Sequence, residues 1–137
     1  LSLVGSEMCI RDREYRLALS SPRIELFDDF SLCGRRFAGE TWNAICDSIV
    51  VRLPEKVYVS FDIDVLSVEY CPSTGTPVAG GLTFNEALWL VDRIAAAGRR
   101  IVGFDLCEVA PAREGTTDAN VGARVLFRLC GMALKTN

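Results

Sequence analysis

The chain contains no histidine. Histidine is the usual general base beside a nucleophilic cysteine and a common ligand of transition metals. Cys107 lies next to Glu108, but without a neighbouring base we do not expect it to act as a nucleophile. Any hydrolytic role must therefore draw on other side chains.

Three further features are missing, and each excludes a class of protein. The six cysteines lie at wide, irregular spacings with no Cys-x-x-Cys pair, which argues against a zinc site or a redox motif. We expect them to be buried thiols in a reducing compartment, which indicates a cytoplasmic protein. No apolar run approaches the roughly 18 residues of a membrane span. The net charge of −3 lacks the basic excess of a nucleic-acid binder.

The remaining pattern predicts an α/β protein. Residues 56–61 are β-branched and aromatic, which is typical of a strand. Thr83 and Glu86 form a capping box that should begin a helix ending near Gly98. Residues 100–106 form a mostly apolar run, as in a buried parallel strand. Strand, helix and strand in this order predict parallel pairing.

The regions on either side of this unit are predicted to contain both irregular segments and helices. We expect residues 14–40 to be irregular, with Phe27-Asp28-Asp29-Phe30 and Gly34 in loops and turns. A helix should follow from Thr41 to about Arg52. Thr117 or Asp118 should cap a last helix through Leu134. Trp42 and Trp89 are expected in the core.

The most informative segment is Ser60-Phe61-Asp62-Ile63-Asp64, at the end of the first predicted strand. Strand alternation would place Asp62 and Asp64 on one side and Ile63 on the other. Two carboxylates at the carboxyl end of a strand suit Mn²⁺ or Mg²⁺. The loop Cys71-Pro72-Ser73-Thr74-Gly75-Thr76-Pro77 and the pair Gly80-Gly81 follow.

These residues resemble the signature of the ureohydrolases, the arginase and agmatinase family, which reads Ser-x-Asp-x-Asp, then Thr-Gly-Thr-Pro and Gly-Gly. The resemblance continues in Gly103-Phe104-Asp105-Leu106-Cys107-Glu108-Val109-Ala110-Pro111. It implies the C-terminal part of a three-layer α/β/α parallel-sheet domain. One departure stands at Ser67-Val68, where the family usually has Asp-Pro, and it affects the stiffness of the loop.

The resemblance also implies roles for individual residues. Asp62 would bridge two Mn²⁺ ions and Asp64 would ligate one of them. Glu108 would pair with a guanidinium, Thr76 would line the same pocket, and Asp105 would orient its neighbours without binding metal. The implied reaction is hydrolysis of a guanidino substrate, arginine or agmatine, to urea and an amine, with arginine slightly favoured.

Relatives in this family are expected to form trimers or hexamers and to bring further histidine and aspartate ligands from upstream. Residues 3–12 resemble a translated sequencing adapter rather than a signal peptide. We therefore expect residues 1–13 to be non-native and residues 14–137 to be the C-terminal portion of one ureohydrolase domain, inactive alone.

Two alternatives remain open. A degenerate subunit could keep the fold without catalysis, and Ser67-Val68 is the observation in its favour. Asp-x-Asp after a strand also begins the haloacid-dehalogenase-like phosphatases, in which the first aspartate attacks phosphate and the metal is Mg²⁺. That reading leaves the Thr-Gly-Thr-Pro loop and Glu108 without a role.

Overall fold

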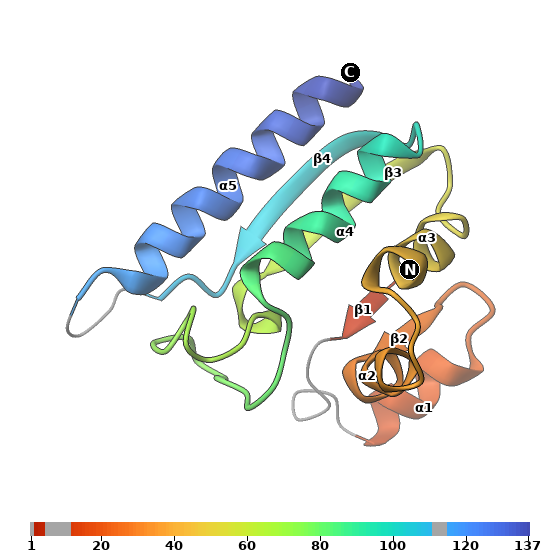
Figure 1. Cartoon of the computed structure of the whole chain (residues 1–137), viewed down its shortest axis with the longest axis horizontal. Coiled ribbons are helices and arrows are strands. Elements are labelled where there is room, and N and C mark those ends of the chain that lie inside the picture. The colour runs from red at the N-terminus through yellow and green to blue at the C-terminus, as the bar shows by residue number, and fades with distance from the viewer. Residues whose placement is uncertain (1, 5–11, 111–114) are drawn as a thin grey trace.

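The computed structural model describes residues 2–4, 12–110 and 115–137. Cys9, most of the adapter-like segment and Pro111 of the second motif lie outside the described residues. Figure 1 shows two groups of elements: a long pair of strands with helices α4 and α5 alongside, and a smaller group that contains β1, β2, α1 and α2. The candidate site belongs to the first group.

The prediction that residues 14–40 are irregular is wrong. Helix α1 (Asp12–Ser20) is followed by strand β2 (Leu26–Asp28), which pairs in parallel with β1 (Ser2–Val4), and then by helix α2 (Asp29–Phe37). Asp28 caps α2, because its carboxylate accepts hydrogen bonds from the backbone N–H of Ser31 at 2.9 Å and from its hydroxyl at 2.6 Å. Gly34 lies inside α2 despite its low helix propensity, with open space around it.

The second sheet confirms the predicted parallel pairing. Strands β3 (Lys56–Asp62) and β4 (Arg100–Cys107) run side by side, and Asp62 is opposite Cys107 in the register. Gly103 is opposite Tyr58, and a Cβ at position 103 would lie 2.9 Å from the Tyr58 ring. The two strands therefore end at the same edge, which brings Asp62 and Glu108 together.

Helix α4 (Phe84–Ala96) forms as predicted. The Thr83 hydroxyl accepts from the N–H of Glu86, and the Glu86 carboxylate accepts from the N–H of Thr83, which completes the capping box. Gly98 follows the last turn with φ of 72°, a left-handed conformation that favours glycine. Helix α3 (Trp42–Val50) begins after Thr41, also as expected.

The predicted cap of the last helix is wrong. Helix α5 (Thr117–Thr136) begins after Thr116, and no side chain caps it. Asp118 is instead fully buried and accepts a hydrogen bond from a distant loop. An aspartate near the start of a helix often caps it, but the carboxylate of Asp118 accepts a tertiary hydrogen bond instead.

The core lies between the helices and one face of β3 and β4. Its fully buried members come from α3, β4, α5 and the turn after β3, and include Ile45, Ile49, Ile63, Ile101 and Val125. Tyr58 and Val102 lie on the strands but are 59% and 51% exposed. The described part of the chain thus supplies a helical layer for one face of this sheet.

Four positions expected to be buried differ in the structure, and one of them, Cys33, is only partly buried. Trp89 is 43% exposed, and Cys107 and Cys130 are exposed thiols. Trp42 is partly buried against the core, and Cys46 and Cys71 are buried as expected. Within the described ranges, no helix is both long enough and apolar enough to cross a membrane.

Candidate metal and substrate site

Asp62 and Asp64 lie at a strand-to-turn junction. Strand β3 ends at Asp62, and a 3-10 turn, η2 (Ile63–Val65), begins there, so Asp64 is not part of the strand as alternation suggested. Oδ1 of Asp62 accepts a hydrogen bond from the N–H of Asp64 at 3.1 Å. Ile63 is fully buried between them. The turn therefore keeps both carboxylates on the open side while Ile63 anchors the backbone.

The charged form of Asp62 is disfavoured by partial burial and, to a smaller extent, by two neighbouring carboxylates. Partial burial raises its pKa to about 6, and the nearby carboxylates of Asp64 and Glu108 contribute to the rise. A negative charge that is disfavoured by its neighbours in this way is stabilised when a cation lies among them. The acidic cluster has the character of a cation site.

The signature loop returns to the turn that carries these aspartates. The N–H of Leu82 donates to the carbonyl of Val65, and the N–H of Ser67 donates to the carbonyl of Leu82, both at 3.0 Å. Gly81 has φ of 80°, and a Cβ there would lie 2.9 Å from the Val65 carbonyl oxygen. A glycine at this position thus allows the close approach of two backbone segments.

The departure from the family signature at Ser67-Val68 leaves this closure in place. Besides its bond to Leu82, Ser67 accepts a hydrogen bond from the N–H of Tyr70 at 2.9 Å, and its hydroxyl contacts the carboxylate of Glu69. The turn is thus formed by Ser67 and its neighbours without an Asp-Pro pair.

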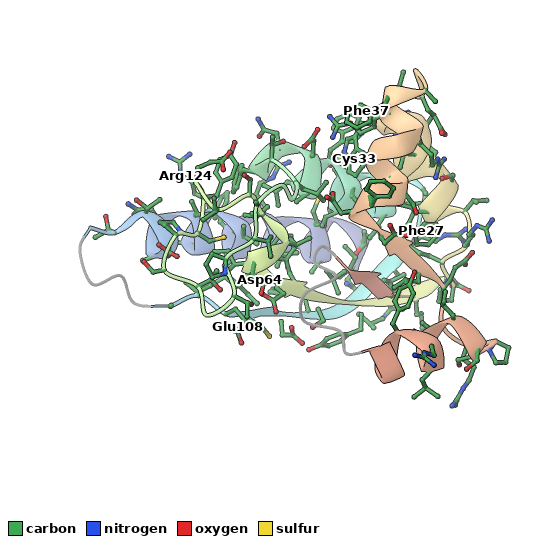
Figure 2. The ribbon with its side chains drawn as sticks, turned by 90° about the horizontal axis from the view of Figure 1, so that it is seen from below. Phe27, Cys33, Phe37, Asp64, Glu108 and Arg124 are labelled. Carbon is green, nitrogen blue, oxygen red and sulfur yellow. The ribbon has the colours of Figure 1, made fainter. Side chains whose placement is uncertain are left out.

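Thr76 and Gly75 connect the loop to both acidic positions. The Thr76 hydroxyl donates to Oδ2 of Asp64 at 2.5 Å. A Cβ on Gly75 would lie 3.5 Å from Oε2 of Glu108, so the Glu108 carboxylate lies close to the backbone of Gly75. Figure 2 shows Asp64 and Glu108 near each other, beyond the strand ends. The structure therefore brings together Asp62, Asp64, Thr76 and Glu108.

Glu108 has an unusual backbone conformation. Its φ is 61°, and it is the one non-glycine residue with positive φ in the described ranges. Such a conformation is costly for a residue with a Cβ, and strained backbone of this kind clusters at functional sites. It directs an exposed carboxylate from the end of β4 toward the loop.

Asp105 lies on the same strand, two residues before Cys107. Its Oδ1 accepts hydrogen bonds from the Ser60 hydroxyl at 2.7 Å and from the Cys107 thiol at 3.4 Å. The hydrogen bond from Ser60 is the main cause that lowers the pKa of Asp105, and the bond to Asp105 is the main cause that raises the pKa of Cys107. A raised thiol pKa is opposite to what a nucleophilic cysteine needs.

Two further side chains hold this loop in place, Cys71 within it and Asp118 outside it. Neither was predicted from the sequence to have this role. Cys71 is 1% exposed, and its thiol donates to the carbonyl of Ile63 at 3.3 Å. Burial raises the pKa of Cys71 to about 11, so the thiol stays protonated. Oδ2 of Asp118 accepts from the N–H of Ser73 at 2.9 Å. The contact between Asp118 and Ser73 spans 45 residues, so local sequence signals cannot predict it.

The residues present fit part of a metal site. Carboxylate oxygens are suitable ligands for Mn²⁺ and Mg²⁺. Within the described residues, however, no three histidine, cysteine or acidic side chains form a group that could hold an ion by themselves. Asp62 and Asp64 could therefore supply at most part of a ligand set.

Comparison with known proteins places this fold and site in one family. The arginase family matches residues 12–131, so the chain belongs to the arginase family. The matched region includes both acidic positions and the loop between them. The chain thus has an α/β fold of the kind found in this family.

Individual relatives match over part of their length. The chain is 44% identical over 91 residues to the N(1)-aminopropylagmatine ureohydrolase of Thermococcus kodakarensis, covering 64% of this chain and 30% of that protein. It is 31% identical over 104 residues to human arginase-1, covering 72% of this chain and 32% of that protein. The chain therefore spans about a third of the length of these relatives.

Solved structures give the same result for the fold. The proclavaminate amidino hydrolase of Streptomyces clavuligerus superposes with a TM-score of 0.68 at 27% identity, covering 83% of this chain and 36% of that one. An arginase from Bacillus cereus superposes with a TM-score of 0.72 at 20% identity, covering 96% of this chain and 42% of that one.

Proposed function

We propose that the complete gene product containing this chain hydrolyses a guanidino compound to urea and an amine, in a reaction that depends on two Mn²⁺ ions. The observation that carries the proposal is the meeting of Asp62 and Asp64 with Glu108 at one sheet edge, with Gly75 and Thr76 between them. Membership of the arginase family supports the same reaction.

Asp62 and Asp64 would hold the ions. Their oxygens suit Mn²⁺. Partial burial raises the pKa of Asp62, the carboxylates of Asp64 and Glu108 add to the rise, and a cation beside Asp62 would favour its charged form. Thr76 fixes Oδ2 of Asp64 through its hydroxyl, which limits the rotation of that carboxylate. When bound, the Mn²⁺ ions would supply Lewis acidity that makes a water molecule nucleophilic at neutral pH.

Glu108 would hold the substrate. A carboxylate can form a charge-assisted, bidentate pair with a planar guanidinium, and such a pair fixes both position and orientation. Its exposed position beside Gly75 leaves the carboxylate open to a ligand. In the reaction a C–O bond forms at the guanidinium carbon, the C–N bond to the amine breaks, and the departing nitrogen takes a proton.

Asp105 would have an indirect role. Its bond to Ser60 ties β4 to β3 two residues before the strands end, which helps to fix the spacing of Asp62 and Glu108. This role is positional, since the hydrogen bonds that Asp105 makes are to Ser60 and Cys107.

We further propose that residues 14–137 are one portion of a ureohydrolase domain and that the remaining ligands come from outside this chain. The partial ligand set and the third of a relative's length that the chain spans support this view. The complete protein is proposed to be a cytoplasmic homo-oligomer, a trimer or hexamer. Free thiols at Cys46 and Cys71 fit a reducing compartment, and Phe30 and Phe37, 82% and 88% exposed on α2, offer surface for assembly.

A urea assay on the complete gene product tests the proposal. After loading with Mn²⁺, the protein should release urea from at least one of arginine, agmatine and guanidinobutyrate, and lose that activity on treatment with a chelator. A generic phosphate ester in the same assay separates ureohydrolase from phosphatase activity. Urea from none of the three substrates, with Mn²⁺ bound, would favour the degenerate subunit.

A further inference from the structure

Asp118 lies in the first turn of α5, where an acidic side chain is usually exposed, but here it is fully buried. Its side chain has 0% exposure, and Oδ1 has no hydrogen-bond partner among the described residues. Burying a carboxylate is costly unless its hydrogen bonds repay the cost. Among the described residues Oδ2 accepts one hydrogen bond, from the N–H of Ser73 at 2.9 Å, and this contact offsets part of the cost of burial.

Cys71 makes a second buried contact two residues earlier. Its thiol lies under the carbonyl of Ile63, at 3.3 Å, and also approaches the carbonyl of Leu66 at 3.7 Å. Ile63 is the residue between Asp62 and Asp64. The start of the signature loop is thus attached to the backbone of the turn that presents both aspartates.

The two contacts hold the loop from different sides. Cys71 attaches it to η2, and Asp118 attaches it to the first turn of α5. Three residues beyond Ser73, the Thr76 hydroxyl meets Asp64, and Gly75 lies against Glu108. A shift of the backbone at Ser73 would be transmitted to Thr76 through this short segment.

We propose that Asp118 and Cys71 are positioning residues that fix residues 71–76, so that Thr76 orients the Asp64 carboxylate and Gly75 leaves room for Glu108. The proposal rests on the proposed function for its catalytic consequence, but its structural consequence is independent of that function. Neither residue touches the substrate. Both act through the loop.

Kinetics on the complete gene product test the catalytic consequence. Asp118→Ala should lower kcat/KM for the guanidino substrate about tenfold or more, as expected when a buried hydrogen bond to the loop is lost. Asp118→Asn keeps an oxygen acceptor for Ser73 and should retain most of the activity. Val125→Ala is the matched control, because Val125 is fully buried two helical turns further along α5 and belongs to the core rather than to the loop contacts.

A double-mutant cycle shows whether Asp118 acts through Thr76. Thr76→Val removes the hydroxyl that contacts Asp64. If the proposal holds, Asp118→Ala should have a much smaller effect in the Thr76→Val background than in wild type. Equal effects in both backgrounds would contradict it, as would a Val125→Ala loss as large as that of Asp118→Ala when compared per folded protein.

Hydrogen exchange provides a measurement that does not need activity. In the same protein without substrate, residues 71–81 should exchange faster in Asp118→Ala than in wild type, Asp118→Asn or Val125→Ala. If Asp118→Ala does not fold, Cys71→Ala should show the same faster exchange, and Cys71→Ser should show less of it. Unchanged exchange in the folded alanine variants would overturn the proposal. Absence of urea release from wild type would overturn only the proposed function.

Discussion

The Thr76 hydroxyl donates a hydrogen bond to Oδ2 of Asp64 over 2.5 Å. This contact joins the Thr-Gly-Thr-Pro loop directly to one of the two aspartates at the end of β3. A hydroxyl at this distance occupies one oxygen of the carboxylate and leaves the other available for a cation. The loop thus fixes the orientation of one carboxylate at the acidic edge.

The first prediction concerns substrate binding. Glu108→Gln removes a charge while it nearly preserves the shape of the side chain. A hydrogen bond to a charged group contributes about 1.5–3 kcal/mol, so kcat/KM of the complete protein should fall about ten- to hundredfold or more. Bound Mn²⁺ should stay near the wild-type amount. Asp92→Asn, the same kind of change on α4, is the control and should leave kcat/KM unaltered.

The second prediction concerns the glycines. Gly81→Ala should destabilise the protein by more than about 2 kcal/mol, because a Cβ is strained at positive φ and would also collide with the Val65 carbonyl. Gly131→Ala, in α5 with open space around the new Cβ, should instead stabilise it by about 0.5–1 kcal/mol. Chemical unfolding of both variants gives the two free energies. The free energy of unfolding should fall in Gly81→Ala and rise in Gly131→Ala. A change in the same direction in both variants would contradict the close contact between Gly81 and Val65.

The third prediction concerns residues 14–137 expressed alone. Two strands are marginal as an independent sheet, and Tyr58, Val102 and Phe127 are 59%, 51% and 78% exposed. This portion should therefore self-associate, unfold without a cooperative transition and release no urea. Size-exclusion chromatography and a thermal melt test it. A monomer with one sharp transition would mean that this portion folds autonomously.

Local signals in the sequence were sufficient for part of the fold. The β-branched run at residues 56–61 and the capping box at Thr83 act over a few residues, so they predicted β3 and α4 correctly. The prediction for residues 14–40 failed because Asp28 and Gly34 are residue types typical of turns. In α2 the Asp28 carboxylate caps the helix, and Arg35 and Arg36 lie in its last turn.

The candidate site shows the same division. Asp62, Asp64, Thr76 and Glu108 belong to contiguous motifs, and the sequence could therefore identify them. Asp118 could not be identified, since its position near a helix start favours a cap. Its actual partner, Ser73, lies 45 residues away in the sequence. Contacts of this kind depend on the packing of α5 against the loop, which local patterns do not encode.

The fourth prediction tests the central claim, that the aspartates at the end of β3 are metal ligands. Asp62→Asn replaces a carboxylate by a neutral amide of nearly the same size, and an amide cannot replace the charge that two dications need. The decisive measurement is the Mn²⁺ content per protein of Asp62→Asn, compared with wild type and Glu108→Gln after the same loading and dialysis. The account predicts a clear loss of Mn²⁺ in Asp62→Asn and a near wild-type content in Glu108→Gln. A full Mn²⁺ complement in Asp62→Asn, or loss of metal in Glu108→Gln alone, would contradict it.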